Sequence, residues 1–196
     1  ASPAGIMDGA AHREGLAPAY NQYGPSAHDA LYEAEHEDAL MLLRGLFMTS
    51  FLADDAIADH DHYGAESVLI SSASSKTSIA LAYLVAQKGK SKAVGLTSAG
   101  NLDFVNSLGC YDQVLTYDAI ESLPSDRSAV YVDMSGNGGV QRTIHAHFDS
   151  QLKHSCSIGA THWDADRSEG ELAGPKPEFF FAPSQIAKRS KDWGPG

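Results

Sequence analysis

Short apolar runs alternate with amphipathic stretches over most of the chain beyond residue 63. The runs predict six strands: Val68–Ile70, Ala93–Thr97, Gln113–Thr116, Ala129–Met134, Ser155–Ala160 and Glu178–Ala182. Continuous apolar runs separated by helices are typical of parallel strands that are buried on both faces. The pattern therefore predicts an α/β fold with a doubly wound, mostly parallel, six-stranded Rossmann-like sheet.

Helical spacing fills the gaps between these runs. Ile79, Ala82, Tyr83 and Ala86 share one face, and a further helix is expected over 102–108. Val140, Ile144 and Phe148 recur every four residues after the fourth strand, as an apolar helix face requires.

The N-terminal part of the chain has a different pattern. Residues 1–27 show no periodicity and predict an extended arm. Two helices are expected over Glu33–Leu43 and Thr49–Asp59, with Gly45 interrupting them. We therefore expect residues 1–62 to form an arm with helices, and residues 63–196 to form the Rossmann-like dinucleotide-binding domain.

Composition narrows the class of protein. The 196 residues carry a net charge of -11, which argues against nucleic-acid binding because no basic stripe offsets the acidic groups. No apolar run is long enough to span a membrane, and the N-terminus lacks a signal-peptide pattern. Cys110 and Cys156 lie in apolar contexts and are expected to be reduced thiols. These features predict a cytoplasmic protein.

The loop after the first strand is the strongest candidate for ligand binding. Ser74, Ser75, Lys76 and Thr77 would offer hydroxyls, backbone amides and one cation to the pyrophosphate of a dinucleotide at a helix N-terminus. A serine-rich helix cap is the competing interpretation. The glycine spacing of a Walker loop is missing, which argues against a nucleotide triphosphatase.

The second strand ends without an acidic residue. Thr97, Ser98 and Asn101 are neutral, and a carboxylate at this position would repel a 2′-phosphate. This favours NADP(H) over NAD(H) at the adenosine end, although Ser98 could equally be a simple helix cap.

Two further loops complete the predicted site. Ser135, Gly136 and Asn137 are expected to border the adenine or ribose, and Thr161 and His162 to face the nicotinamide. His162 is a weak candidate for an acid or base, because such histidines are more often structural. Two histidine pairs, at 60 and 62 and at 145 and 147, lack a third ligand at defined spacing, so we predict no metal site.

Several motifs together resemble one family of unknown function, which is distantly similar to the zinc-independent medium-chain dehydrogenases/reductases. They are Asn21–Tyr23, Leu42–Phe51, Ser71–Thr77, Gly95–Ser98, Ser107–Tyr111, Gly159–Trp163 and Phe179–Arg189. The resemblance runs from Asn21 to Gly194. It implies a second, barrel-like domain that this sequence lacks, and dimerisation through the last strand at Phe179–Phe181. The loop Ser71–Thr77 departs from the superfamily's usual glycine-containing turn.

The resemblance implies the cofactor-binding domain of an NADP(H)-preferring oxidoreductase that reduces a carbonyl or a conjugated alkene, with a small-molecule substrate that the sequence does not identify. The main alternative is a non-catalytic Rossmann module that binds a nucleotide or a protein partner. A third possibility is an enzyme for acyl or phosphate ligands that uses the same cleft.

Overall fold

The computed structural model describes residues 5–16, 18–158 and 171–194 and divides the chain into two compact units. Unit 1 holds residues 1–45 and 183–196, and unit 2 holds residues 46–182. This division differs from the expected boundary after residue 62. It places the second part of the long helix α1 (Glu37–Asp59) with the sheet, because Ala53 and Ile57 of that helix are buried in the sheet's core.

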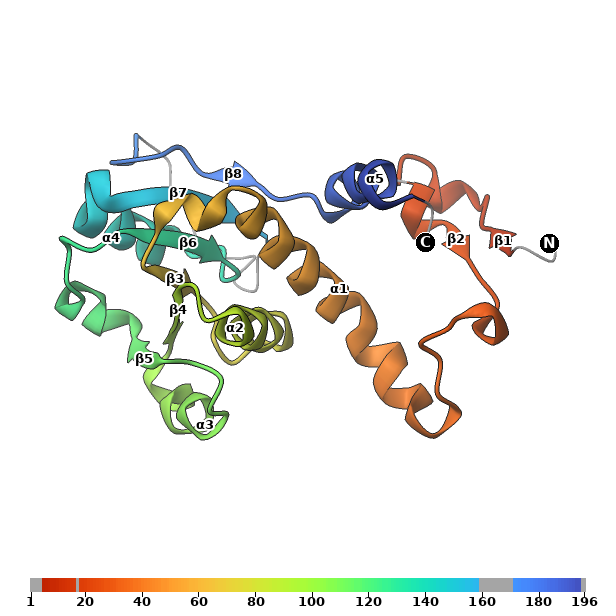
Figure 1. The fold of residues 1–196 in the computed structure, drawn as a ribbon, viewed down its shortest axis with the longest axis horizontal. Helices are drawn as coiled ribbons and strands as arrows, with labels where there is room; N and C mark the ends of the chain where they lie inside the picture. Colours follow the sequence, from red (N-terminus) through yellow and green to blue (C-terminus); the bar gives the residue numbers. More distant parts are fainter. Residues whose placement is uncertain (1–4, 17, 159–170, 195–196) are drawn as a thin grey trace. The chain divides into compact units, whose positions relative to one another are not determined.

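Unit 2 is built around a parallel sheet of six strands (Figure 1). The strands are β3 (Ser67–Ile70), β4 (Lys92–Thr97), β5 (Gln113–Thr116), β6 (Ala129–Asp133), β7 (Leu152–Ser157) and β8 (Glu178–Phe179). Their spatial order is β5-β4-β3-β6-β7-β8, and every neighbouring pair is parallel. The predicted fold class is confirmed, and the order of strands reverses between β3 and β6.

Helices cover both faces of this sheet. On one face, α1 and α2 (Lys76–Lys88) pack on Val68 and Ile70. On the other, α4 (Gly138–Phe148) and the 3-10 helix η7 (Tyr117–Ser122) pack on Leu69 and Tyr131. Alternate residues of β3 therefore enter opposite cores, as the period-two geometry of a strand requires. A short helix, α3 (Leu102–Ser107), joins β4 to β5.

One helix prediction and one strand prediction were wrong. Residues 37–59 form one continuous helix rather than two, because a single glycine at position 45 costs only about 1 kcal/mol and leaves the backbone hydrogen bonds intact. The expected last strand, Glu178–Ala182, is limited to Glu178–Phe179, since α5 (Ala182–Trp193) begins immediately afterwards. Pro183 lies in the first turn of α5, where its missing amide is tolerated, so it does not mark the end of a strand.

Unit 1 contains little regular structure. Its elements besides α5 and the first part of α1 are a two-stranded antiparallel pairing of β1 (Ile6–Met7) with β2 (Gln22–Tyr23) and four 3-10 turns. None of its described residues is buried, and every core residue of the described chain lies between positions 50 and 156. The extended arm expected over residues 1–27 thus carries some local structure but no core.

A left-handed turn connects α1 to β3. Residues Asp61–Gly64 all have positive φ, from 52° to 66°, and only the last of them is a glycine. Each non-glycine residue in this conformation costs roughly 1–2 kcal/mol. The ring of Tyr63 stacks between those of His60 and His154, with centroid distances of 4.9 and 4.3 Å, and so anchors the turn.

No helix in the described ranges combines the length and the apolar character needed to cross a membrane. Both cysteines are free thiols, as predicted. Burial raises the pKa of Cys156 to about 12, so this thiol is protonated at neutral pH and is not a nucleophile.

The buried histidine of α4 links stability to pH. His145 is fully buried; its Nδ1 lies 2.8 Å from the carbonyl oxygen of Ala173 and its Nε2 lies 2.9 Å from the Ser155 hydroxyl. A carbonyl can only accept, so Nδ1 carries the proton and Nε2 accepts from the serine. Burial lowers the pKa of His145, as it also does for His62 and His154.

We expect the free energy of unfolding to fall as the pH drops from 8 to 5. The unfolded histidine takes up a proton near pH 6.5, whereas the folded one does so only at lower pH, so unfolding consumes protons in this window. Chemical denaturation at several pH values should show a smaller fall for His145→Gln than for the wild type. His12→Gln, at an exposed position, should leave the pH-dependent fall in the free energy of unfolding unchanged. An equal fall for both variants would contradict the attribution to His145.

Candidate nucleotide site

The loop after β3 lies at the point where the strand order reverses, which is where open α/β sheets bind their ligands. The loop runs from Ser71 to Ser75 and leads directly into α2, so the positive end of the helix dipole faces it. The predicted position of the site at the carboxyl end of the first Rossmann strand therefore agrees with the topology.

The first half of this loop is closed by hydrogen bonds. The backbone amide of Ser71 donates to the carbonyl of Val132 at 3.2 Å, and that of Ala73 donates to the carbonyl of Leu96 at 3.1 Å. Between them, the amide of Ser72 donates to the Tyr117 hydroxyl at 3.0 Å. These three amides are already paired, so they are not available to an anion.

The second half of the loop is open. Within the described ranges, the backbone amides of Ser74, Lys76 and Thr77 have no hydrogen-bond acceptor. Ser75 caps α2: its hydroxyl accepts from the amide of Ser78 at 3.2 Å. The Lys76 side chain is exposed at the first position of the helix. A helix start with three free amides and one cation matches what a phosphate group requires.

Residues from the second loop lie beside this opening. Asn101 donates from Nδ2 to the hydroxyls of Ser74, at 3.3 Å, and Ser98, at 3.2 Å. Asn101 and Ser98 are exposed, whereas Thr97 is buried at the end of β4. Three predicted residues from two loops are thus in direct contact, whereas the buried Thr97 is not exposed beside them.

The loop after β6 uses its side chains internally. Ser135 is fully buried and donates from its hydroxyl to Asp133 at 2.8 Å, and Asn137 caps α4 by accepting from the amides of Gly139 and Val140. Gly136 has a φ of 67°, a conformation that favours glycine. Thr161 and His162 lie outside the described residues.

Sequence reasoning missed the buried group that joins the two central loops. Asp133, at the end of β6, is nearly inaccessible, and its Oδ1 accepts from the hydroxyls of Ser71 and Ser135 and from the amides of Ser135 and Gly136, at 2.8–3.0 Å. We call Asp133, Ser71 and Ser135 the Asp133 junction. A lone acidic residue at the end of an apolar strand was the signal for it in the sequence.

The histidine pairs at 60 and 62 and at 145 and 147 have other uses. Each of the four rings makes a hydrogen bond with a protein group, and these groups are Ala56, Ser91, Ala173 with Ser155, and Leu123. Among the described residues, the one group spaced for a metal ion is Glu33, Glu35 and His36, and all three are exposed.

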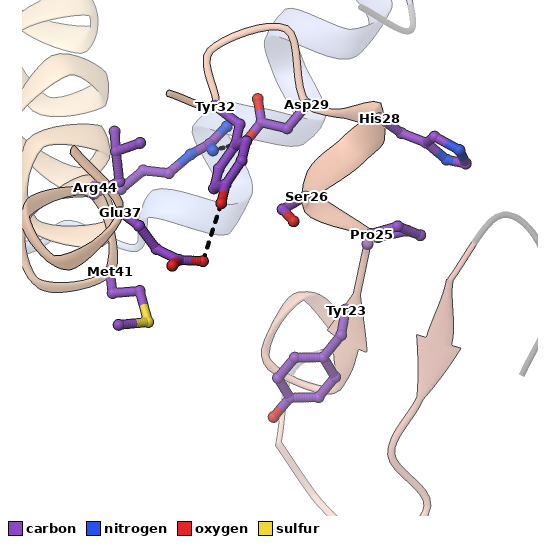
Figure 2. Close-up of a pocket in the computed structure, with 11 residues that line it drawn as sticks. Tyr23, Pro25, Ser26, His28, Asp29, Tyr32, Glu37, Met41 and Arg44 are labelled. Carbon is purple, nitrogen blue, oxygen red and sulfur yellow. Dashed lines mark hydrogen bonds and ion pairs between the residues drawn. The ribbon is translucent and has the colours of Figure 1, made fainter. Parts of the chain in front are cut away.

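A separate cavity of about 800 Å³ lies within unit 1 (Figure 2). Glu37, Met41 and Arg44 project into it from α1, and Pro25 and Ser26 lie on the opposite side. Arg44 forms an ion pair with Asp29, and the Tyr32 hydroxyl donates to Glu37 at 3.1 Å. That hydrogen bond to a carboxylate raises the pKa of Tyr32. No pattern in the sequence predicts that these residues lie together.

The comparisons place the chain in a family. All of its residues, 1–196, match the family described as a protein of unknown function, DUF2855, and the chain belongs to that family. Among curated proteins, no sequence matches the chain.

Solved structures confirm the fold. A candidate NADPH:quinone reductase from Mesorhizobium loti is 11% identical with a TM-score of 0.61. The match covers 90% of this chain and 51% of the reductase chain. CurA from Vibrio vulnificus, solved with NADPH, is 12% identical with a TM-score of 0.54; the match covers 75% of this chain and 48% of CurA. L-Idonate 5-dehydrogenase from Escherichia coli is 11% identical with a TM-score of 0.53; the match covers 88% of this chain and 50% of the dehydrogenase. The chain spans about half the length of these proteins, and at such low identity the likeness shows a shared fold alone.

Gly95 is required by the packing under the loop. A Cβ atom at this position would lie 2.9 Å from the ring of Tyr111 and 3.0 Å from the Cβ of Ala73. Tyr111 in turn donates from its hydroxyl to the carbonyl of Ala73 at 2.9 Å. A side chain at position 95 would therefore push both Tyr111 and the loop.

We expect Gly95→Ala to lower the free energy of unfolding by about 1–3 kcal/mol, because overpacking a buried site forces neighbouring atoms to move. Denaturant titration would measure the loss. Gly100→Ala is a matched control in the next loop, since no atom lies within 4 Å of its added Cβ. A loss as large for the control as for position 95 would contradict the steric explanation.

Proposed function

We propose that this chain is the nucleotide-binding part of a zinc-independent oxidoreductase that prefers NADP(H) and reduces a carbonyl or a conjugated alkene. The observation that carries the proposal is the set of free amides at Ser74, Lys76 and Thr77, which opens at the strand-order reversal beside an exposed lysine. The fold shared with NADPH-bound CurA supports it.

Each part of the site takes one part of the cofactor. The free amides and the Lys76 ammonium hold the pyrophosphate, and Ser98 with Asn101 lies at the adenosine end. No carboxylate follows Thr97 until Asp103 in α3, so a 2′-phosphate meets hydroxyl and amide groups instead of a negative charge. The loop at Gly136 and Asn137 borders the ligand through its backbone, because its side chains are used internally.

When bound, the cofactor would supply the hydride, and the protein's contribution is binding and orientation. The predicted contacts at the nicotinamide end, Thr161 and His162, remain part of the proposal. The non-catalytic alternative shares the same site but has no turnover. Measuring NADPH oxidation with a panel of carbonyl compounds separates the two.

We further infer that the active oxidoreductase includes a second domain that packs against unit 1. Unit 1 has no buried residue among those described, yet exposes large apolar side chains, and a stable domain must bury such groups. They are Ile6, Met7, Leu16, Tyr20, Tyr23, Leu31, Met41, Leu42, Leu43, Ile186 and Trp193. A second domain that covers these residues would complete unit 1 and supply the substrate side.

The proposed cofactor site predicts how Lys76 affects binding. In a fluorescence titration with the chain as printed, Lys76→Ala should weaken NADPH binding by about tenfold to a hundredfold, since a charge-assisted hydrogen bond is lost. NADH should bind the wild type more weakly than NADPH.

Lys92→Ala is the matched control, because Lys92 is exposed at the opposite end of β4 and should not affect binding. Wild-type protein that binds neither nucleotide at millimolar concentration would refute the proposed function.

The edge strand β8 supports the predicted homodimer. Phe179 and Phe181 are 74% and 39% exposed, their ring centroids lie 6.4 Å apart, and β8 is the last strand of the sheet. An unpaired edge with exposed aromatic rings favours pairing with a second chain.

Light scattering should therefore give the mass of a dimer for the wild type and of a monomer for Phe179→Lys, because burying a lysine at the interface is costly. Phe104→Lys alters an exposed phenylalanine on α3 and should leave the dimer intact. A monomeric wild type at micromolar concentration is the result that would exclude the dimer.

A further inference from the structure

Contacts with two other loops fix the first half of the loop after β3, residues 71–73. Ser72 has a φ of 52°, a left-handed conformation that glycine normally supplies. Its amide is held by the Tyr117 hydroxyl at 3.0 Å, from a residue 45 positions away. Tyr117 lies at the start of η7 with its ring against the core that α4 covers. A tyrosine distant in the sequence thus stabilises the left-handed conformation of Ser72 in a loop that has no glycine.

Ser71 ties the same half-loop to β6. Its hydroxyl donates to Asp133 at 2.9 Å and accepts from the amides of Met134, at 2.9 Å, and Ser135, at 3.1 Å. One donor and two acceptor sites are all that a hydroxyl has, so this group is fully used. Ser71 is completely buried, which excludes water from replacing any of these bonds.

Resting on the proposed function, we propose that Tyr117 and Ser71 are positioning residues for the cofactor. Neither side chain is placed to touch the anion. The Ser72 amide that Tyr117 holds precedes the free amides of Ser74, Lys76 and Thr77. The Ser71 hydroxyl is buried and bonded to residues at and after the end of β6. By fixing residues 71–73, Tyr117 and Ser71 direct the three free amides toward one point and remove the need for glycines. The glycine-poor loop is therefore kept ready to bind by its neighbours, rather than by its own backbone freedom.

The opposite role for Tyr117 would be a plug that occupies the anion's position. The geometry argues against it, since the Ser72 amide is partly buried and faces the tyrosine from the core side of the loop. The open amides lie further along the chain, at the start of α2. The two roles predict opposite effects on affinity, so one substitution decides between them.

Tyr117→Phe removes only the hydroxyl, and two measurements on the 196-residue chain follow its effect. We expect NADPH affinity to fall about tenfold, as the loss of one hydrogen bond at a binding loop implies. Amide hydrogen exchange without nucleotide should become faster in residues 72–78, while exchange in α4 stays unchanged. Tyr83→Phe, at an exposed position on α2, is the matched control and should change neither quantity.

Ser71→Ala is the second variant and should act on both loops. Hydrogen exchange should become faster in residues 71–78 and also in residues 133–137, because the amides of Met134 and Ser135 lose their shared acceptor. Faster exchange in two loops would distinguish Ser71→Ala, which breaks the Asp133 junction, from Tyr117→Phe, which removes a single contact. Should Ser71→Ala fail to fold, Tyr117→Phe alone decides the matter.

Unchanged or tighter NADPH binding by Tyr117→Phe would overturn the proposal, and so would an exchange increase spread evenly over unit 2. If the wild type binds no NADPH, the proposed function fails. The positioning role is then judged by hydrogen exchange alone: faster exchange confined to residues 72–78 supports it, and no change refutes it.

Discussion

The buried carboxylate of Asp133 is the constraint on which the candidate site depends. A charge removed from water must be compensated by protein donors, and four hydrogen bonds to one oxygen do this. Two of the donors are backbone amides of its own loop, and a third is Ser71 at the end of β3. Separating the carboxyl ends of β3 and β6 would therefore remove one of the four donors to this buried carboxylate.

Much of the fold could be predicted from the sequence, because strands buried on both faces leave a strong apolar signal. Val68–Ile70 and Ala129–Met134 were placed to within one residue of β3 and β6. The errors concerned the ends of elements, which were predicted from single residues. Gly45 was expected to interrupt a helix that continues through it, and the last strand was expected to run to Ala182, where α5 begins. In both cases the neighbouring residues decide the outcome.

The candidate site was predictable where topology alone brings residues together. Ser74 and Asn101 follow adjacent parallel strands, whose carboxyl ends meet at one edge, and they are in contact. Tyr117 was not predictable, since its contact with Ser72 depends on how η7 packs across the sheet. The role of Ser135 was also hidden, because a loop serine in a sequence gives no indication that its hydroxyl is consumed by a buried carboxylate.

The left-handed turn at Asp61–Gly64 has a consequence for the evolution of this family. It determines how the buried face of α1 is oriented relative to β3. Adding or removing one residue there would shift the start of β3 relative to the helix face that carries Ala53 and Ile57. Length variation among relatives should therefore be excluded from this turn and should accumulate elsewhere, which makes Asp61–Gly64 a fixed reference point for aligning very divergent members.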